Sequence, residues 1–156
     1  MSKSNNLPYR QGVGVMLFNT RKQIFVGKRI DNKSAWQMPQ GGIDQNEKAV
    51  DAVRRELQEE TGIISIKIIK QSDKTYTYDL PDNLIGKIWK GKFKGQTQTW
   101  FLAEFTGKDS EIKLDQKNPE FKKWKWVDLK ELPNLIVPFK KKLYQDLIDE
   151  FKAFIY

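Results

Sequence analysis

Three glutamates with helical spacing are the residues of this chain best suited to chemistry. Glu56, Glu59 and Glu60 stand three and four residues apart, and at about 100° per residue this spacing puts all three carboxylates on one side of a helix. Carboxylate oxygens are hard ligands that suit Mg²⁺ and Mn²⁺. The alternative is an acidic helix face that makes surface ion pairs. The spacing therefore predicts either a divalent-metal site or a solvated acidic face.

The surroundings of these carboxylates favour the metal site. Three apolar residues form a stripe along the same helix: Val50, Val53 and Leu57. The acidic face therefore borders the core. Glu59 and Glu60 also lie in the last turn before Gly62, where the helix dipole disfavours negative charge by about 0.3–1 kcal/mol per group. A helix that accepts these costs beside its core is expected to hold cations.

The ends of this helix can be predicted from local chemistry. Asn46 is a competent N-cap, and Glu47 would then lie favourably in the first turn. Gly62 is expected to end the helix. A second amphipathic helix is expected at 139–154, where apolar residues recur at helical spacing.

The remaining segments predict a mixed sheet on which the two helices pack. Six runs are β-branched, aromatic or alternating and predict strands: 12–19, 23–28, 63–70, 74–78, 96–105 and 123–127. The polar link 20–22 predicts a hairpin, and 29–42 and 81–95 are expected to be loops. With residues 1–7 as a flexible tail, the chain (1–156) is expected to form one α/β (α+β) domain, an α/β/α sandwich.

The composition excludes several kinds of chemistry. The chain has no Cys and no His, so disulfides, thiolate zinc sites, a Cys nucleophile and a Ser–His triad are excluded. Proton transfer must come from carboxylates, Lys, Tyr or metal-bound water. A net charge of +8 suits a polyanionic partner such as nucleic acid or nucleotide. No signal peptide or membrane-spanning run is present, so we expect a cytoplasmic protein with no membrane partner.

A longer pattern surrounds the three glutamates. The fixed positions of the Nudix box are occupied by Gly41, Glu47, Arg55-Glu56-Leu57, Glu59-Glu60 and Gly62-Ile63. The chain thus resembles a Nudix hydrolase. This resemblance implies that water cleaves a nucleoside diphosphate linked to another group, with the help of a divalent cation. It also implies an α/β/α sandwich around a mixed sheet.

The resemblance assigns expected roles within the box. The implied metal ligands and catalytic carboxylates are Glu56, Glu59 and Glu60, with the Gly41 carbonyl as a further ligand. The expected cofactor is Mg²⁺, with Mn²⁺ or another divalent cation as a substitute. Arg55 is expected to orient the glutamates by ion pairing. Glu47 and Gly62 are expected to be structural.

The flanks of the box narrow the resemblance. Residues 36–40, WQMPQ, are similar to the segment that precedes the box in bacterial RNA pyrophosphohydrolases and in the related asymmetric dinucleoside tetraphosphate hydrolases. Further similar segments are 8–10, 95–101, 119–126 and 138–144. The chain departs from that group at Gln45-Asn46, where the group has Pro-Gly, and at Thr97, where it has a basic residue. The likeness nevertheless covers nearly the whole chain.

These flanks imply further site residues. Glu120 would be brought in by a loop as another metal ligand or as a base, which suits a chain without His. Phe139 would stack on a base opposite the Arg29 guanidinium, and Tyr78 is a candidate for the same surface. The residues expected to contact phosphates are Arg10, Arg29, Ser34 and Lys140. The alternatives are a surface acid for Glu120 and a core position for Phe139.

Two enzymatic functions and one binding function follow. The leading hypothesis is an RNA 5′ pyrophosphohydrolase, which converts 5′-triphosphorylated or diphosphorylated RNA to the 5′-monophosphate and so promotes RNA decay. The second is hydrolysis of diadenosine tetraphosphate, or another dinucleoside polyphosphate, to ATP and AMP. The third is a metal-free RNA- or nucleotide-binding domain, against which three intact, mutually repelling glutamates argue. The identity of any protein activator stays open.

Overall fold

Two long strands at the centre of the sheet carry the rest of the fold. The structure is a computed structural model, and it describes residues 6–31 and 35–156. β1 (Tyr9–Phe18) and β7 (Gly95–Phe105) run parallel, in register from Tyr9 opposite Gly95 to Phe18 opposite Glu104. Their buried residues form nearly continuous runs, because both faces of the sheet are covered.

Shorter strands extend this central pair into a mixed sheet. They are β2 (Ile24–Arg29), β3 (Trp36–Gln37), β4 (Gln40–Gly42), β5 (Ile66–Gln71), β6 (Tyr76–Asp79) and β8 (Phe121–Val127). β2 and β4 pair antiparallel with β1, and β5 and β6 pair antiparallel with β7. β3 and β8 pair antiparallel with β2. The sheet is therefore parallel only at its centre.

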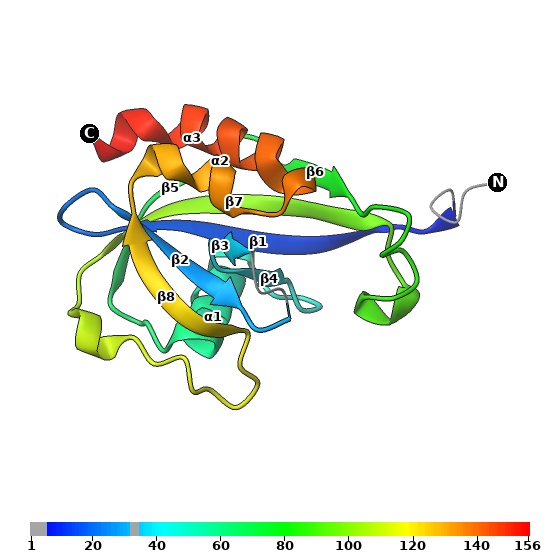
Figure 1. Cartoon of the computed structure of the whole chain (residues 1–156), viewed down its shortest axis with the longest axis horizontal. Helices are drawn as coiled ribbons and strands as arrows, with labels where there is room; N and C mark the ends of the chain where they lie inside the picture. The colour runs from blue at the N-terminus through cyan, green and yellow to red at the C-terminus, as the bar shows by residue number, and fades with distance from the viewer. Residues whose placement is uncertain (1–5, 32–34) are drawn as a thin grey trace.

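Helices cover the two faces of this sheet (Figure 1). α1 (Ala49–Thr61) packs on one face, and α2 (Leu132–Leu135) and α3 (Lys141–Ile155) pack on the other. Alternate residues of β1 divide between the two layers: Val15 joins the core cluster of α1, and Met16 joins that of α3. This arrangement confirms the predicted α/β/α sandwich.

The N-terminal cap predicted for α1 is wrong. The helix begins at Ala49, and Lys48 occupies the N-cap without a side-chain hydrogen bond. Asn46 instead adopts a left-handed turn conformation, with φ 66°, which Asn tolerates better than most residues. Glu47 consequently precedes the helix rather than lying in its first turn. The predicted end is confirmed, because Gly62 has φ 76° and its N–H donates to the Gln58 carbonyl.

Two other differences concern short elements. Segment 29–42, expected to be a loop, contains β3 and β4, whose two and three residues are too few to show a strand pattern. The four-residue helix α2 was not predicted for the same reason. Short 3₁₀ turns also occur at Trp89–Gly91, Asp109–Glu111, Leu129–Glu131 and Pro138–Lys140. The polar link 20–22 does form the predicted hairpin between β1 and β2.

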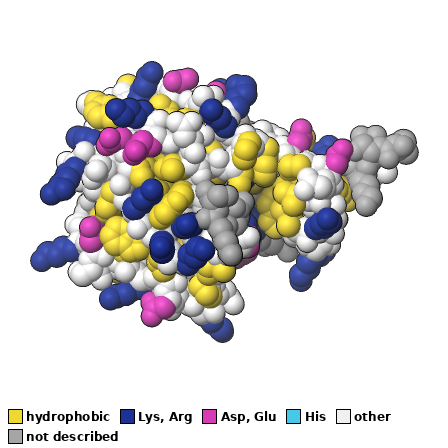
Figure 2. Space-filling view, in the orientation of Figure 1, with side chains coloured by type: hydrophobic (Ala, Val, Ile, Leu, Met, Phe, Trp, Pro, Cys, Tyr) yellow, Lys and Arg dark blue, Asp and Glu magenta, His cyan; other side chains and the backbone are white. Residues whose placement is uncertain are grey.

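The charged side chains of the surface are mainly cationic. Lys and Arg outnumber acidic side chains on the face shown in Figure 2, in agreement with the net charge of +8. Among the described residues, no helix is both long and apolar enough to cross a membrane.

One buried hydrogen bond connects helix α3 to the segment between β3 and β4. The Met38 N–H donates to the Tyr144 hydroxyl at 2.8 Å, and both residues are fully buried. The Tyr144 ring also packs edge-on against Trp100 of β7, with ring centroids 6.3 Å apart. This bond fixes the backbone just before Gln40 and Gly41, so a C-terminal helix supports a segment that lies more than a hundred residues earlier.

We predict that Tyr144→Phe lowers the free energy of unfolding by about 1–3 kcal/mol, because it leaves the buried Met38 N–H without its acceptor. Urea unfolding followed by circular dichroism measures the change. Tyr9→Phe is the matched control, since the Tyr9 hydroxyl bonds to Asp79 in an exposed position and its loss should cost less than about 0.5 kcal/mol. Equal losses for the two variants would contradict the importance of this bond.

Candidate active site

A cavity of about 800 Å³ collects most of the predicted site residues. Its size is within the usual range for small-molecule sites, about 300–1,000 Å³. The predicted residues that line it are Arg10, Arg29, Gly41, Glu56, Glu59, Glu60, Tyr78, Glu120, Phe139 and Lys140. Ser34, also predicted to bind substrate, lies outside the described residues. The cavity thus unites side chains from both ends of the sequence.

Glu60 is the most deeply buried of the three helical glutamates. It is 4% exposed, and its Oε2 atom has no hydrogen-bond partner among the described residues. Burial raises the pKa of its carboxyl well above the usual value, and the charges of Glu56 and Glu120 raise it further. The Gln40 backbone N–H opposes this by favouring the carboxylate. A buried acid with one unpaired oxygen and two acidic neighbours is an unfavourable arrangement unless a cation joins it.

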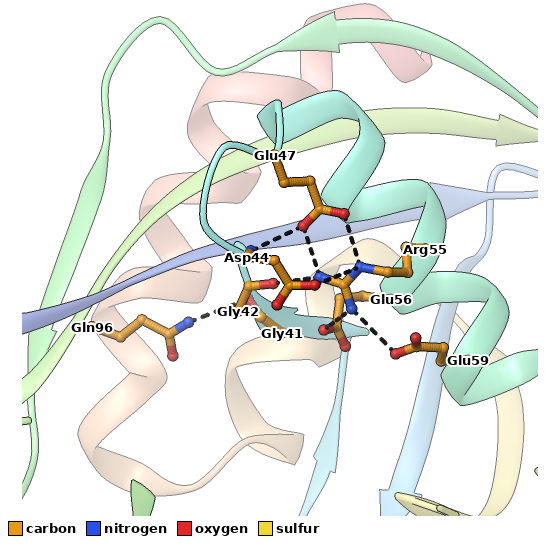
Figure 3. Close-up of polar contacts among 8 residues, drawn as sticks. All are labelled: Gly41, Gly42, Asp44, Glu47, Arg55, Glu56, Glu59 and Gln96. Carbon is orange, nitrogen blue, oxygen red and sulfur yellow. Dashed lines mark hydrogen bonds and ion pairs between the residues drawn. The ribbon is translucent and has the colours of Figure 1, made fainter. Parts of the chain in front are cut away.

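Arg55 joins the start of the box to the helix that carries the glutamates (Figure 3). Its guanidinium binds Glu47 through two hydrogen bonds of 2.8 and 2.9 Å, and it donates to the Gly42 carbonyl at 2.9 Å. It also pairs with Glu56 at 2.8 Å and with Glu59 at 3.2 Å. The ion pairs expected of Arg55 are therefore present, and one planar cation fixes two of the three glutamates.

The same contacts set the ionisation of the neighbouring acids. The hydrogen bonds from Arg55, followed by that from the Asp44 N–H, lower the pKa of Glu47 to about 2. Glu56 is in the opposite situation: burial raises its pKa, and the contacts with Arg55 only partly compensate. Glu47 is thus a permanently charged partner of Arg55, whereas the charged form of Glu56 would be stabilised by a further cation.

Gly41 is required by the close approach of Glu56. A Cβ atom at this position would lie 2.1 Å from the Glu56 carboxyl, so a side chain here would displace the glutamate. The Gly41 carbonyl accepts a hydrogen bond of 3.4 Å from Gln96 Nε2, and the Tyr78 hydroxyl donates to Gln96 Oε1 at 3.0 Å. Figure 3 shows the Gln96 amide directed toward Gly41. Gln96, fully buried in β7, therefore orients this carbonyl.

These groups fit a divalent cation. The donor set consists of carboxylate oxygens and one carbonyl oxygen, as hard cations prefer. The buried Glu60 Oε2 atom, which has no hydrogen-bond partner among the described residues, is also available to a cation. Within 6–31 and 35–156, no three acidic side chains are already arranged around a common metal position, and Arg55 instead holds Glu56 and Glu59 in ion pairs. Binding of a cation therefore implies some rearrangement of these two side chains.

The other side of the cavity is cationic and aromatic. Lys140 is only 3% exposed, and its ammonium lies 4.9 Å from the Tyr78 ring centroid and 5.8 Å from that of Phe139. Burial, together with the charge of Arg29, lowers the pKa of Lys140 to about 7. Arg29 is held by an ion pair with Asp31 and by a hydrogen bond of 3.3 Å to Gln37. These contacts place several positive charges where phosphates could bind.

The two aromatic candidates differ in exposure. Phe139 is 37% exposed and lines the cavity, which suits a stacking surface and argues against the core alternative. Tyr78 is buried, with its ring 5.9 Å from that of Phe139 and its hydroxyl bonded to Gln96. Tyr78 therefore supports Phe139 and Gln96 more than it offers a free face.

The sequence interpretation missed one wall of the cavity. The residues of this wall are Leu80, Leu84, Ile88 and Trp89, which precede β7. The Trp89 ring lies 5.2 Å from the guanidinium carbon of Arg10, a cation–π contact that orients Arg10. Trp89 lies in segment 81–95, which the sequence predicts only as a loop, and an aromatic residue among its lysines is the available signal. Gln37 and Gln40 were also missed as lining residues.

Comparisons with known proteins agree with this geometry. The model of the NUDIX domain matches residues 8–147. RNA pyrophosphohydrolases from Novosphingobium aromaticivorans and Sphingopyxis alaskensis are 52% and 54% identical to this chain. The first alignment covers 96% of this chain and 96% of the relative, and the second covers 97% and 98%.

Solved structures share the fold at lower sequence identity. The dihydroneopterin triphosphate pyrophosphohydrolase of E. coli has a TM-score of 0.71 at 19% identity, covering 90% of this chain and 97% of that one. The Ap4A hydrolase of C. elegans, in a binary complex, has a TM-score of 0.69 at 20% identity, covering 94% and 97%. The domain match spans most of this chain, and the glutamates, Arg55 and Gly41 of the box lie together in the structure. This chain therefore belongs to the Nudix family of hydrolases.

Proposed function

We propose that this protein is an RNA 5′ pyrophosphohydrolase, which removes pyrophosphate or phosphate from 5′-triphosphorylated or diphosphorylated RNA. The observation that carries the proposal is a single cavity with a carboxylate cluster and an exposed aromatic ring, Phe139, beside buried cationic groups. A phosphate chain attached to a base needs positive charge for its phosphates, from cationic side chains and a bound cation, and an aromatic face for its base. Relatives of about this chain's length, at 52% and 54% identity, bear the name RNA pyrophosphohydrolase.

In this proposal the carboxylates hold a divalent cation, with Mg²⁺ as the natural occupant and Mn²⁺ or another divalent ion as a substitute. The ligands are Glu56, Glu59, Glu60 and the Gly41 carbonyl, with Glu120 contributed by the segment before β8. When bound, the cation supplies charge neutralisation at the phosphates and increases the acidity of water. Arg55 and Gln96 orient these ligands through the contacts described above.

The cationic and aromatic residues position the substrate, and Glu120 has a second role in taking up a proton. Arg10, Arg29 and Lys140 bind phosphate oxygens, and Phe139 stacks on a base. Water attacks phosphorus in line with the leaving oxygen, so the protein contributes mainly positioning and charge stabilisation. Glu120 accepts the proton of that water, because the chain has no His to do so. Ser34 stays a prediction for phosphate contact.

Hydrolysis of diadenosine tetraphosphate is the second candidate, because the same cavity could bind a polyphosphate with a nucleoside at each end. The Ap4A hydrolase of C. elegans has this fold, although at 20% identity the likeness concerns the fold alone. We expect kcat/KM to be higher for a 5′-triphosphorylated RNA oligonucleotide than for diadenosine tetraphosphate, each assayed with Mg²⁺. A higher value for diadenosine tetraphosphate would favour the second candidate.

Glu60→Gln should lower kcat/KM for the RNA substrate by about 10²–10³-fold, since metal stabilisation of transition-state charge amounts to several kcal/mol. The variant should stay folded and lose no stability in the presence of a chelator, because it replaces a buried carboxyl whose Oε2 lacks a partner by an amide of the same shape. Initial rates and thermal unfolding measure the two effects. Near-native rates for the variant, or wild-type rates that survive exhaustive chelation, would contradict the metal-site assignment.

Lys140 predicts a pH dependence of substrate binding. Its pKa of about 7 means that the free enzyme loses this positive charge as the pH rises through neutrality. A bound phosphate favours the charged form, so KM for RNA should increase above about pH 7 while kcat changes less. Lys140→Met should raise KM and remove this dependence. An identical pH profile of KM in the variant would exclude Lys140 as its origin.

A further inference from the structure

A second basic surface lies outside the cavity, where strands β3, β2 and β8 lie side by side. Lys28 of β2 is in register with Trp36 of β3 on one side and with Lys123 of β8 on the other. Lys125 lies two residues further along β8, so its side chain points to the same face as that of Lys123. Figure 2 shows Lys and Arg side chains gathered over the part of the molecule that β2 and β8 occupy in Figure 1.

Trp36 holds two of these cations close together. The Lys125 ammonium lies 4.3 Å from the centroid of the Trp36 ring, and the Lys28 ammonium lies 5.7 Å from it. Both distances are within the range of cation–π contacts, about 6 Å. Two like charges are therefore gathered on a single indole ring that is itself only partly buried.

The described residues provide no acidic partner for this surface. None of the ion pairs in 6–31 and 35–156 includes Lys28, Lys123 or Lys125. Lys28 and Lys123 are moreover directly opposite each other across two strands, where like charges are destabilising. An arrangement that repels itself and has no internal counter-charge suits an external polyanion.

The surface begins at the rim of the cavity. β8 starts at the residue after Glu120, and the Ile30 N–H at the end of β2 donates to the Glu120 carbonyl at 3.1 Å. At about 3.3 Å per residue, Lys123 and Lys125 lie roughly 10 and 17 Å along the strand from Glu120. A 5′ phosphate group bound at the carboxylates does not extend that far, whereas the chain attached to it does.

We propose that Lys28, Lys123 and Lys125, arranged around Trp36, bind the phosphate backbone of RNA downstream of the 5′ end. This inference rests on the proposed function, since it assigns the continuation of the same substrate. Contacts of this kind are independent of sequence and depend strongly on salt. The surface would give long RNA an advantage that dinucleotides and dinucleoside polyphosphates lack.

The test compares the double variant Lys123→Gln/Lys125→Gln with the wild type on a 5′-triphosphorylated RNA of about twelve nucleotides. This length is within the range of site sizes of single-strand-binding domains, about 4–16 nucleotides. Binding is measured by fluorescence anisotropy, in Ca²⁺ to suppress turnover, and kcat/KM is measured in Mg²⁺. Each phosphate contact adds about 0.7 to the salt slope for single strands. From about 50 to about 200 mM salt, wild-type affinity should therefore fall about sevenfold more than that of the variant.

Two controls make the result specific. A 5′-triphosphorylated dinucleotide should be cleaved equally by wild type and variant, because it does not reach the surface. The double variant Lys67→Gln/Lys108→Gln removes the same amount of charge at another place, because Lys67 lies on β5 at the opposite edge of the sheet. This variant should behave as wild type on the long RNA.

Several outcomes would overturn the inference. These are an unchanged salt slope in the β8 variant, an equal loss in both lysine pairs, or an equal loss on the dinucleotide. Self-association of the β8 variant with unchanged RNA affinity would show that these lysines serve only to block edge-to-edge strand pairing. If the wild type cleaves neither RNA, the proposed function fails, and the anisotropy measurement then decides the binding surface by itself.

Discussion

The guanidinium of Arg55 binds the acidic side chains of helix α1 and, at the same place, the segment that precedes this helix. Helix α1 places acidic side chains beside the core, and the segment before it presents a backbone carbonyl and Glu47 nearby. Arg55 donates two hydrogen bonds to Glu47 and a third to the Gly42 carbonyl, and it still reaches Glu56 and Glu59. Lys has no planar array of donors and could not join these groups in fixed directions. Together with the apolar packing of Val53 and Leu57, this side chain contributes to the orientation of α1 against β4.

The position of Gly41 depends on that orientation. Because the Glu56 carboxyl occupies the space that a Cβ atom at Gly41 would fill, helix and strand approach each other closely at this point. Gln96 from the central strand β7 and Met38, bonded to Tyr144 of α3, hold the segment from the other sides. All layers of the sandwich therefore contribute to a site whose carboxylates come mainly from a single helix.

The helix itself could be predicted from sequence, because its determinants are local. Glutamate spacing, the apolar stripe and Gly62 act within one or two turns, and the structure agrees with each of them. The start of the helix could not be predicted, and the cap expected at Asn46 is absent, because Glu47 bonds both to Arg55, eight residues on, and to the Asp44 N–H, and so sets the turn. The Tyr144–Met38 bond and the contact of Trp89 with Arg10 join distant segments and leave no periodic trace. The carboxylates were thus predictable, whereas most groups that orient them were not.

The cavity has an acidic side with Glu56 and Glu60 and a basic side with Lys140 and Arg29, and the charges of both sides favour a bound ligand. Burial raises the pKa values of Glu60 and Glu56, and neighbouring carboxylates raise them further, so a nearby cation would favour their charged forms. Burial, and after it the charge of Arg29, lowers the pKa of Lys140 on the opposite side, so a nearby anion would favour its charged form. Among the described residues, Lys140 and Glu60 form no ion pair with each other or with any other group. A polyphosphate together with a divalent cation supplies both missing charges at once, and each would improve the binding of the other. Such reciprocal coupling favours a ligand that carries several phosphates over one that carries a single negative charge.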